Sequence, residues 1–260
     1  MTHGREKQDA FSAYTQFADL YDGLMNDVDY DRWADYVTML LTVHAEGGKM
    51  RFLIDAACGT GAITRRMKQR GYDVIGTDLS EDMLRVAQQR TMEQGMRIPY
   101  VREDMRRLSA HKPADAVLAC CDAVNYLTSL ADVSAFFAAA WQALRPGGLL
   151  LFDISSAYKL EYILGEHTYG EDRADCTYLW QNVFDPVTRL IQMDLVFFLP
   201  EGDGYRRFDE THIQRAHTRR EIDELLEKSG FSVLDTYDAF TVHGAEETSQ
   251  RIQWAARKEV

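Results

Sequence analysis

The stretch Leu53-Ile54-Asp55-Ala56-Ala57-Cys58-Gly59-Thr60-Gly61 joins an apolar run, which ends on a carboxylate, to a turn with two glycines. A second apolar run, Val74-Ile75-Gly76-Thr77-Asp78, ends on another carboxylate. This spacing of about 20 residues is typical of a nucleoside-binding βαβ unit, in which strand, glycine turn and helix follow one another. Gly59 and Gly61 would let the backbone come close to a ligand, with the N–H groups at the helix start pointing at it. The pattern therefore predicts a nucleoside ligand, and Asp78 suits a ribose diol.

The residues around the turn disfavour a dinucleotide. Thr64 stands where a dinucleotide fingerprint has its third small residue, and Asp55 would face the ligand where a pyrophosphate carries negative charge. A cationic ligand fits better, and S-adenosylmethionine carries a sulfonium and an ammonium group together with a ribose. The alternative interpretation is a structural helix–sheet turn in which Asp55 is buried and capped.

Four motifs, in this order along the chain, resemble those of the class I S-adenosylmethionine-dependent methyltransferases. They are Asp55-Ala-Ala-Cys-Gly-Thr-Gly61, Gly76-Thr-Asp78-Leu-Ser-Glu-Asp-Met83-Leu, Glu103-Asp104-Met105, and Leu144-Arg-Pro-Gly-Gly148 followed by Leu149-Leu-Leu-Phe-Asp153. The motifs extend over about half of the chain, and the pattern of elements extends the resemblance over nearly all of it. The chain departs from the family at Ala57, where many members have glycine. Alanine is the smallest alternative, so an S-adenosylmethionine cofactor is still expected.

The resemblance implies that residues after the strands bind the nucleoside. Asp78 would accept hydrogen bonds from both ribose hydroxyls, although it is also a candidate cap for the next helix. Asp104 would accept one from the adenine amino group, and the N–H of Met105 would meet a ring nitrogen. Met83 and Met105 would enclose the adenine faces, unless they are ordinary core residues. Contacts with the cofactor are expected from Tyr14, Trp33, Asp55, Ala57, Cys58, Gly59, Gly61, Asp78, Leu79, Met83, Asp104, Met105 and Cys120.

The segment before the glycine motif is expected to form a lid. Apolar and aromatic residues at helical spacing predict two helices within residues 10–45. In the family that the chain resembles, such a segment lies over the cofactor. Tyr14 and Trp33 would then close over its methionine part, where an aromatic face attracts a sulfonium. The alternative is that both residues only anchor the lid to the core.

The segment Ala119-Cys-Cys-Asp122-Ala-Val-Asn125-Tyr126 ends a predicted strand, at the edge of an α/β sheet where ligands bind. We expect the methyl acceptor here, with Asp122 and Asn125 as candidate catalytic residues. Asp122 would orient an amine, or it would cap the following helix. Members of the family that methylate amides or bases often carry Asn or Asp, two prolines and an aromatic residue at this place. The chain has no proline here, which disfavours adenine or cytosine methylation in nucleic acid.

The hydrophobic periodicity predicts one α/β domain with an insertion. Strands are expected at 51–57, 73–78, 99–102, 114–121, 148–154, 231–237 and 251–257, and helices at 62–70, 80–94, 130–144 and 218–229. Three β-rich runs, at 176–184, 189–198 and 205–215, predict an antiparallel meander. The expected fold is a Rossmann-like, seven-stranded class I methyltransferase sheet with a helical lid (1–46), a core (47–155 and 216–260) and an inserted β-meander (156–215).

The composition restricts the class of protein. A chain of 260 residues, 46% of them hydrophobic, suffices for one α/β core. No apolar run approaches the roughly 18 residues of a membrane span, and the first residues lack the apolar core of a signal peptide, so a cytoplasmic protein without a membrane partner is expected. The four cysteines include no C-x-x-C pair, so we expect no metal site and no disulfide framework. The net charge of -12 disfavours a nucleic-acid partner.

Three functions remain open from the sequence. They are a methyltransferase that acts on nitrogen or oxygen of a small molecule, a tRNA or protein methyltransferase, and a non-catalytic S-adenosylmethionine-binding protein. The acidic charge favours the first over tRNA, and the predicted meander resembles that of members that methylate small amines, including glycine and aminosugars. Positioning supplies most of the rate of methyl transfer, so no catalytic triad is needed; His212, His217 and His243 are candidate bases, with none preferred. We expect a small-molecule acceptor and a monomer or homodimer.

Overall fold

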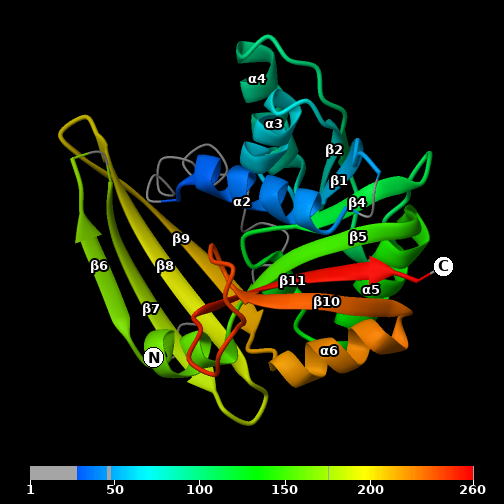
Figure 1. Cartoon of the computed structure of the whole chain (residues 1–260). Coiled ribbons are helices and arrows are strands. Elements are labelled where there is room, and N and C mark those ends of the chain that lie inside the picture. Colours follow the sequence, from blue (N-terminus) through cyan, green and yellow to red (C-terminus); the bar gives the residue numbers. More distant parts are fainter. Residues whose placement is uncertain (1–27, 46–47, 175, 260) are drawn as a thin grey trace.

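The computed structural model describes residues 28–45, 48–174 and 176–259. Two sheets dominate it (Figure 1): a seven-stranded sheet in the order β10-β11-β5-β4-β1-β2-β3 and a four-stranded sheet in the order β6-β7-β8-β9. The first of the two predicted N-terminal helices, with Tyr14, lies outside the described residues. Within the described ranges, no helix is both long and apolar enough to cross a membrane.

The seven-stranded sheet has the predicted class I arrangement. Its strands are β1 (Phe52–Ala56), β2 (Asp73–Asp78), β3 (Tyr100–Arg102), β4 (Ala114–Ala119), β5 (Leu144–Ser155), β10 (Phe231–Asp238) and β11 (Arg251–Lys258). The pairs β1·β2, β1·β4, β2·β3 and β4·β5 are parallel, whereas β11 runs antiparallel to both β5 and β10. The chain order reverses between β1 and β4, so the edge at their carboxyl ends is the place where such sheets bind ligands.

Helices cover both faces of this sheet (Figure 1). They are α2 (Tyr30–Val43), α3 (Ala62–Gln69), α4 (Glu81–Glu93), α5 (Leu130–Ala143) and α6 (Arg219–Lys228), with short helical turns η1 (Met105–Arg107), η2 (Ala123–Tyr126) and η3 (Lys159–Leu164). Ser80 is the N-cap of α4, as predicted, and its hydroxyl accepts a hydrogen bond from the N–H of Met83 at 3.3 Å. Helix starts are fixed by such caps because they satisfy N–H groups that the helix itself leaves unpaired.

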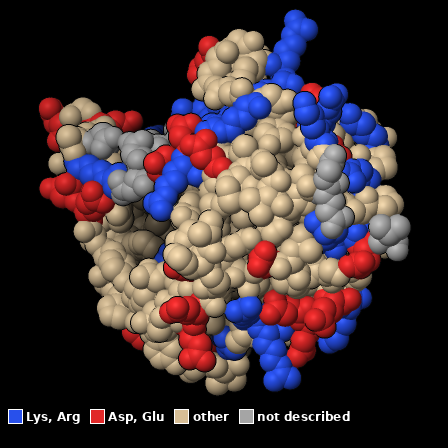
Figure 2. Space-filling model, in the orientation of Figure 1, with Lys and Arg blue, Asp and Glu red and all other residues tan. Residues whose placement is uncertain are grey.

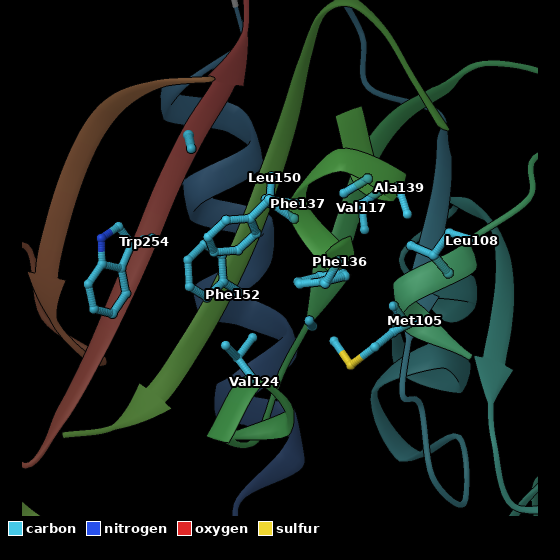
Figure 3. Packing of buried hydrophobic residues seen from close by; sticks show 14 of the residues in the cluster. Met105, Leu108, Val117, Val124, Phe136, Phe137, Ala139, Leu150, Phe152 and Trp254 are labelled. Atoms are coloured by element: carbon cyan, nitrogen blue, oxygen red, sulfur yellow. The ribbon is translucent and has the colours of Figure 1, made fainter. Parts of the chain in front are cut away.

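The core lies on either side of the sheet because successive residues of a buried strand point to opposite faces. On the α5 side, Phe152 of β5 stacks on Trp254 of β11 at 5.3 Å between ring centroids, and Phe136 and Phe137 of α5 pack nearby (Figure 3). On the other face, α2 and α3 bury their apolar sides against the sheet. Apolar side chains therefore dominate both faces of the sheet.

The insertion forms a separate antiparallel sheet of β6 (Thr168–Asp172), β7 (Thr177–Asp185), β8 (Leu190–Glu201) and β9 (Gly204–Arg215). The sequence predicted β7, β8 and β9. It missed β6, which is short and mostly exposed and therefore lacks the apolar alternation of a half-buried strand. Phe197 and Phe208 of this sheet share a buried cluster with Met83 of α4, so the insertion packs onto the body beside the end of β2.

Candidate cofactor and acceptor site

The two glycines of the turn have left-handed backbone conformations. Gly59 has φ +53° and Gly61 has φ +72°. A Cβ atom on Gly59 would meet nothing within 4 Å, so this part of the turn faces open space, whereas one on Gly61 would lie 2.5 Å from the Tyr100 hydroxyl oxygen. Ala57 also has a positive φ, of +54°, a conformation that costs alanine about 1–2 kcal/mol. The turn is therefore open to a ligand at Gly59 and closed by packing at Gly61.

Gly61→Ala is expected to destabilise the protein by more than the roughly 1–2 kcal/mol of a left-handed alanine, because the new methyl group also collides with Tyr100. Gly95→Ala is the matched control, since Gly95 has φ +67° and empty space around its Cα. Denaturant unfolding of both variants measures the difference. Tyr100→Phe should restore part of the loss in Gly61→Ala; equal losses at the two glycines would contradict the packing argument.

Asp78 lies at the carboxyl end of β2 and holds the glycine turn in place. Its Oδ2 accepts a hydrogen bond from the N–H of Gly59 at 2.8 Å, and its Oδ1 accepts one from the N–H of Ser80 at 2.9 Å. Burial raises the pKa of this carboxyl despite these bonds. Each carboxylate oxygen can accept a second hydrogen bond, so Asp78 fits a ribose diol. Leu79, the next residue, is an exposed apolar side chain at the same edge.

Asp55 is buried at the end of β1, with 2% of its surface exposed. The Thr64 hydroxyl donates a hydrogen bond to its Oδ2 at 2.5 Å, which is the capped arrangement of the structural alternative. Burial raises the pKa of Asp55 to about 7, and the neighbouring Asp78 carboxyl adds to the rise. A cationic ligand near Asp55 would favour the ionised form of this carboxyl. The contact between Asp55 and the ammonium group of the cofactor stays a prediction.

The residues expected at the adenine are packed in different ways. Asp104 follows β3, and its ion pair with Arg106 at 2.6 Å holds its pKa below the usual range. Met105 is buried against α5 (Figure 3). Met83 is buried against the insertion. Both methionines thus have the core contacts of the alternative interpretation, and their contact with adenine stays a prediction.

Trp33 lies on α2, beside the start of β11. Only 4% of its surface is exposed, and it packs edge-on against Phe240 at 4.6 Å between ring centroids. The Arg251 guanidinium lies over the Trp33 ring at 5.5 Å. Trp33 therefore packs α2 onto the residues around β11, and its contact with the methionine part of the cofactor stays a prediction. Burial raises the thiol pKa of both Cys58, in the glycine turn, and Cys120, at the end of β4, so both thiols stay protonated at neutral pH.

The backbone is strained where β4 ends. Cys121 and Asp122, neither of them glycine, have φ +61° and +54°, which ends the strand at Ala119 rather than at the predicted Cys121. Each such residue costs about 1–2 kcal/mol and persists only where its surroundings hold it. Strain of this kind clusters at ligand sites.

A network of charged side chains holds Asp122. Its N–H donates to the Asp153 carboxylate at 3.0 Å, its Oδ1 pairs with Arg251 at 2.7 Å, and its Oδ2 accepts a hydrogen bond from Gln214 at 2.9 Å. Arg251 also pairs with the fully buried Asp153. Asp122 makes no side-chain cap to the following helix η2, so the capping alternative is wrong. The sequence analysis missed Arg251 and Gln214, which come from distant strands.

Asn125 is fully buried, and its side-chain amide forms hydrogen bonds with backbone groups. Its Nδ2 donates to the carbonyls of Ser155 and Arg215, both at 3.0 Å, and its Oδ1 accepts from the N–H of Ser155 at 2.9 Å. Ser155 ends β5 and Arg215 ends β9, so Asn125 joins the two ends of the insertion. Both amide hydrogens of Asn125 are thus bound within the chain, which favours a structural role over the expected catalytic one.

The histidines that the sequence offered as bases have different surroundings. His217 is fully buried, and its Nε2 lies 3.0 Å from the Leu127 carbonyl oxygen. His212 lies on the buried face of β9, with its Nδ1 3.2 Å from the Tyr126 hydroxyl. Burial lowers the pKa of each to about 4, so both are neutral at pH 7. His243 is exposed in the loop before β11.

In the part of the chain that the structure describes, we also searched for a metal site and for a cavity away from the carboxyl ends of the strands. No group of three His, Cys, Asp or Glu side chains there is arranged to hold a metal ion. A cavity of about 670 Å³, lined by residues that include Met50, Arg51, Tyr72 and Asp73, lies where β1 and β2 begin. That edge is opposite to the carboxyl ends, where open α/β sheets bind their ligands.

Comparison with known proteins agrees with this geometry. A family model described as "Methyltransferase domain" matches residues 53–148. The Bacillus subtilis (strain 168) protein named "Putative methyltransferase YqeM" is 35% identical over 246 residues, which cover 94% of this chain and 97% of the relative. The crystal structure of an S-adenosylmethionine-dependent methyltransferase from Clostridium acetobutylicum ATCC 824 superposes with a TM-score of 0.86 at 30% identity, over 95% of this chain and 99% of that one. With the glycine turn, the carboxylates after β1 and β2 and the strand order all in place, the chain belongs to the class I S-adenosylmethionine-dependent methyltransferases.

Proposed function

We propose that this methyltransferase acts on nitrogen or oxygen of a small molecule, which binds between the end of β4 and the insertion. The observation that supports this proposal most directly is the hydrogen bond from Gln214, on β9, to Asp122, at the strained end of β4. Through this contact the inserted sheet borders the place where the family transfers its methyl group. Figure 2 shows a hollow between the antiparallel sheet and the body of the molecule. A bordered pocket suits a small molecule better than a macromolecular chain.

Named relatives support an acceptor of this size. The dTDP-4-amino-2,3,4,6-tetradeoxy-D-glucose N,N-dimethyltransferase of Saccharopolyspora spinosa is 24% identical over 82% of this chain. A ubiquinone biosynthesis O-methyltransferase of Idiomarina loihiensis is 30% identical, over 49% of this chain. Both kinds of acceptor are small molecules by name, and they differ in the atom that is methylated.

The proposed mechanism uses positioning rather than a catalytic triad. S-adenosylmethionine supplies an activated methyl group on a sulfonium. Asp78 and the open backbone at Gly59 would hold its nucleoside part, and Asp122, fixed by Arg251 and Gln214, would orient the acceptor. Holding two reactants in line contributes about 7–11 kcal/mol to a bimolecular reaction. The residues of this site can therefore supply most of the rate by geometry alone.

A nucleic-acid substrate has less support. The net charge is -12, and on the face shown in Figure 2 basic and acidic side chains are interspersed. A protein that binds a phosphate backbone needs several basic side chains in register with it. We therefore keep tRNA and protein acceptors as outcomes of the test.

The purified protein is expected to bind S-adenosylhomocysteine with a dissociation constant in the micromolar range, about -8 kcal/mol, and not to bind NAD. It should also transfer a labelled methyl group to members of a panel of small amines and alcohols, but not to bulk tRNA. Asp122→Asn should keep the affinity for S-adenosylhomocysteine within about twofold and lower transfer by about 10-fold or more. Calorimetry and product counting measure the two effects.

The control for this experiment is Asp194→Asn, on the antiparallel sheet, where Asp194 bonds only to Gln192 and Thr211 among the partners described. This variant should bind and transfer as the wild type does. Transfer to tRNA alone would replace the small-molecule proposal. Binding without transfer to any small molecule, protein or RNA acceptor would favour the non-catalytic alternative.

A further inference from the structure

Strand β9 is anchored at two points along the edge where the carboxyl ends of the core strands lie. Toward its end, Gln214 donates a hydrogen bond to Asp122, which follows β4. Toward its start, Phe208 shares a buried cluster with Met83, which follows β2. Because β1 lies between β2 and β4 in the sheet, the stretch of β9 between these anchors spans the part of that edge where β1 ends.

Glu210 lies on this stretch and faces inward. Alternate residues of a strand share a face, and Phe208, Glu210, His212 and Gln214 are all buried, whereas the residues between them are exposed. Only 5% of the Glu210 surface is exposed, and its Oε2 has no hydrogen-bond partner among the described residues. Its neighbour on β8 is the apolar Leu195. A buried carboxyl oxygen without a hydrogen-bond partner is costly, so it indicates that a ligand supplies the missing donor.

The groups around Glu210 indicate which ligand this would be. On its own strand, the nearest titratable group on the same face is the neutral His212, which is bonded to Tyr126 of η2. Asp122, at the far anchor, is paired with Arg251. Burial alone raises the pKa of Glu210 to about 8, with no charged group of the described chain offsetting it. An ammonium group complements such a carboxyl, because its positive charge favours the ionised form and it brings several donors; a carboxylate or phosphate would be repelled by that ionised form.

We propose that Glu210 binds the acceptor, selects an amine, and removes a proton from its ammonium form before methyl transfer. The inference deepens the proposed function and depends on it. The ammonium proton passes to a carboxylate oxygen of Glu210, which frees the nitrogen lone pair. That pair forms the new N–C bond as the C–S bond of the sulfonium breaks, with its electron pair passing to sulfur. The methylated amine leaves as an ammonium ion, and Glu210 releases its proton to solvent.

The first test compares two states of the loaded protein. S-adenosylmethionine and S-adenosylhomocysteine differ by a methyl group and the positive charge on sulfur, so they separate the effect of that charge on Glu210. Protein labelled with ¹³C at the glutamate carboxyl carbons is titrated by NMR in each complex, and the Glu210 signal is the one missing from Glu210→Gln. We expect the protonation constant of Glu210 to fall tenfold or more when the sulfonium is present. The same titration in both complexes would overturn the proposal.

The second test uses propylammonium chloride, propan-1-ol and sodium propionate as probes of the S-adenosylhomocysteine complex. Propylammonium should shift the Glu210 signal and the other two should not. No response to propylammonium, or an equal response to propan-1-ol, would overturn the selection of an amine. Asp209→Asn is the matched control, because Asp209 is the exposed neighbour of Glu210 and pairs with Arg207 at 2.8 Å; it should leave both results unchanged.

Two checks keep the outcomes separate. Glu210→Asp serves to assign the signal if the glutamine variant does not fold. Calorimetry with S-adenosylhomocysteine comes first: absence of binding contradicts the proposed function, whereas normal binding with an unresponsive Glu210 contradicts only the present inference. In transfer assays, Glu210→Gln should lower the rate with amines by tenfold or more and flatten its dependence on pH between about 6 and 9.

Discussion

Replacing Arg251 by methionine is expected to lower the free energy of unfolding by about 3–5 kcal/mol, the cost of removing one partner from a buried ion pair. Arg251 pairs with Asp153, which is fully buried, and with Asp122 at 2.7 Å. Without the guanidinium, two carboxylates face one another beside a strained backbone. For a chain of this size, the loss corresponds to a fall in Tm of roughly 10 °C.

Denaturant unfolding of the wild type and of Arg251→Met measures this loss. Arg207→Met is the control, because Arg207 forms an exposed pair with Asp209, and such pairs contribute about 1 kcal/mol or less. Adding Asp153→Asn to Arg251→Met should recover part of the loss, since it removes one unpaired charge. Similar losses in the two arginine variants would contradict the role of the network.

The same variant should lose stability as the pH rises. Burial raises the pKa of Asp153 in the folded protein, and the pairing with Arg251 opposes that rise. Without Arg251, the folded state holds this proton more tightly than the unfolded state does. A group whose pKa is raised on folding stabilises the fold below its unfolded pKa and loses that contribution as the pH rises through the folded value. The difference from the wild type should therefore be smaller at pH 5 than at pH 8.

Asp78→Ala is expected to weaken the binding of S-adenosylmethionine and S-adenosylhomocysteine by about 10- to 100-fold, because a hydrogen bond to a charged group contributes about 1.5–3 kcal/mol. The variant loses the acceptor for the ribose and also the bond to the N–H of Gly59, which shapes the turn. Asp78→Asn should fall between the wild type and Asp78→Ala, since its amide oxygen can still accept one of these bonds.

The control is Asp73→Ala, at the opposite end of the same strand, where Asp73 pairs with Lys68 at 3.2 Å on the surface. It should leave both affinities within about twofold, as calorimetry can show. Equal affinities of the wild type and Asp78→Ala would remove Asp78 from the ribose site. Equal weakening by both alanine variants would indicate a general loss of the fold instead.

The parts of the fold that the sequence predicted are those encoded by neighbouring residues. The strand at 73–78 has its predicted bounds, because an apolar run between turns is a local signal. Ser80 caps α4 as predicted, because a cap depends on residues within one helical turn. The glycine turn lies between β1 and α3, where the motif predicts it.

The parts that the sequence did not predict depend on contacts between distant segments. Arg251 and Asp122 are 129 positions apart, so no local pattern links them. Asn125 had the position of a catalytic residue but binds two ends of the chain far from it in sequence. For Glu210 the sequence held no such signal, because polar residues stand on both faces of β9, and only the structure shows which face is buried.

Asn125 has a consequence for how such enzymes can diversify. Its amide holds the backbone at the last residues of β5 and β9, so the intervening segment leaves and rejoins the core at one fixed junction. The entropy of closing a loop grows only with the logarithm of its length. Because Asn125 holds both ends of the insertion, the length and sequence of the inserted segment are little constrained by the core. Descendants of one ancestral gene could thus exchange, enlarge or shorten the enclosed segment while inheriting the nucleoside-binding half unchanged. New acceptors would then be acquired by grafting rather than by rebuilding the catalyst.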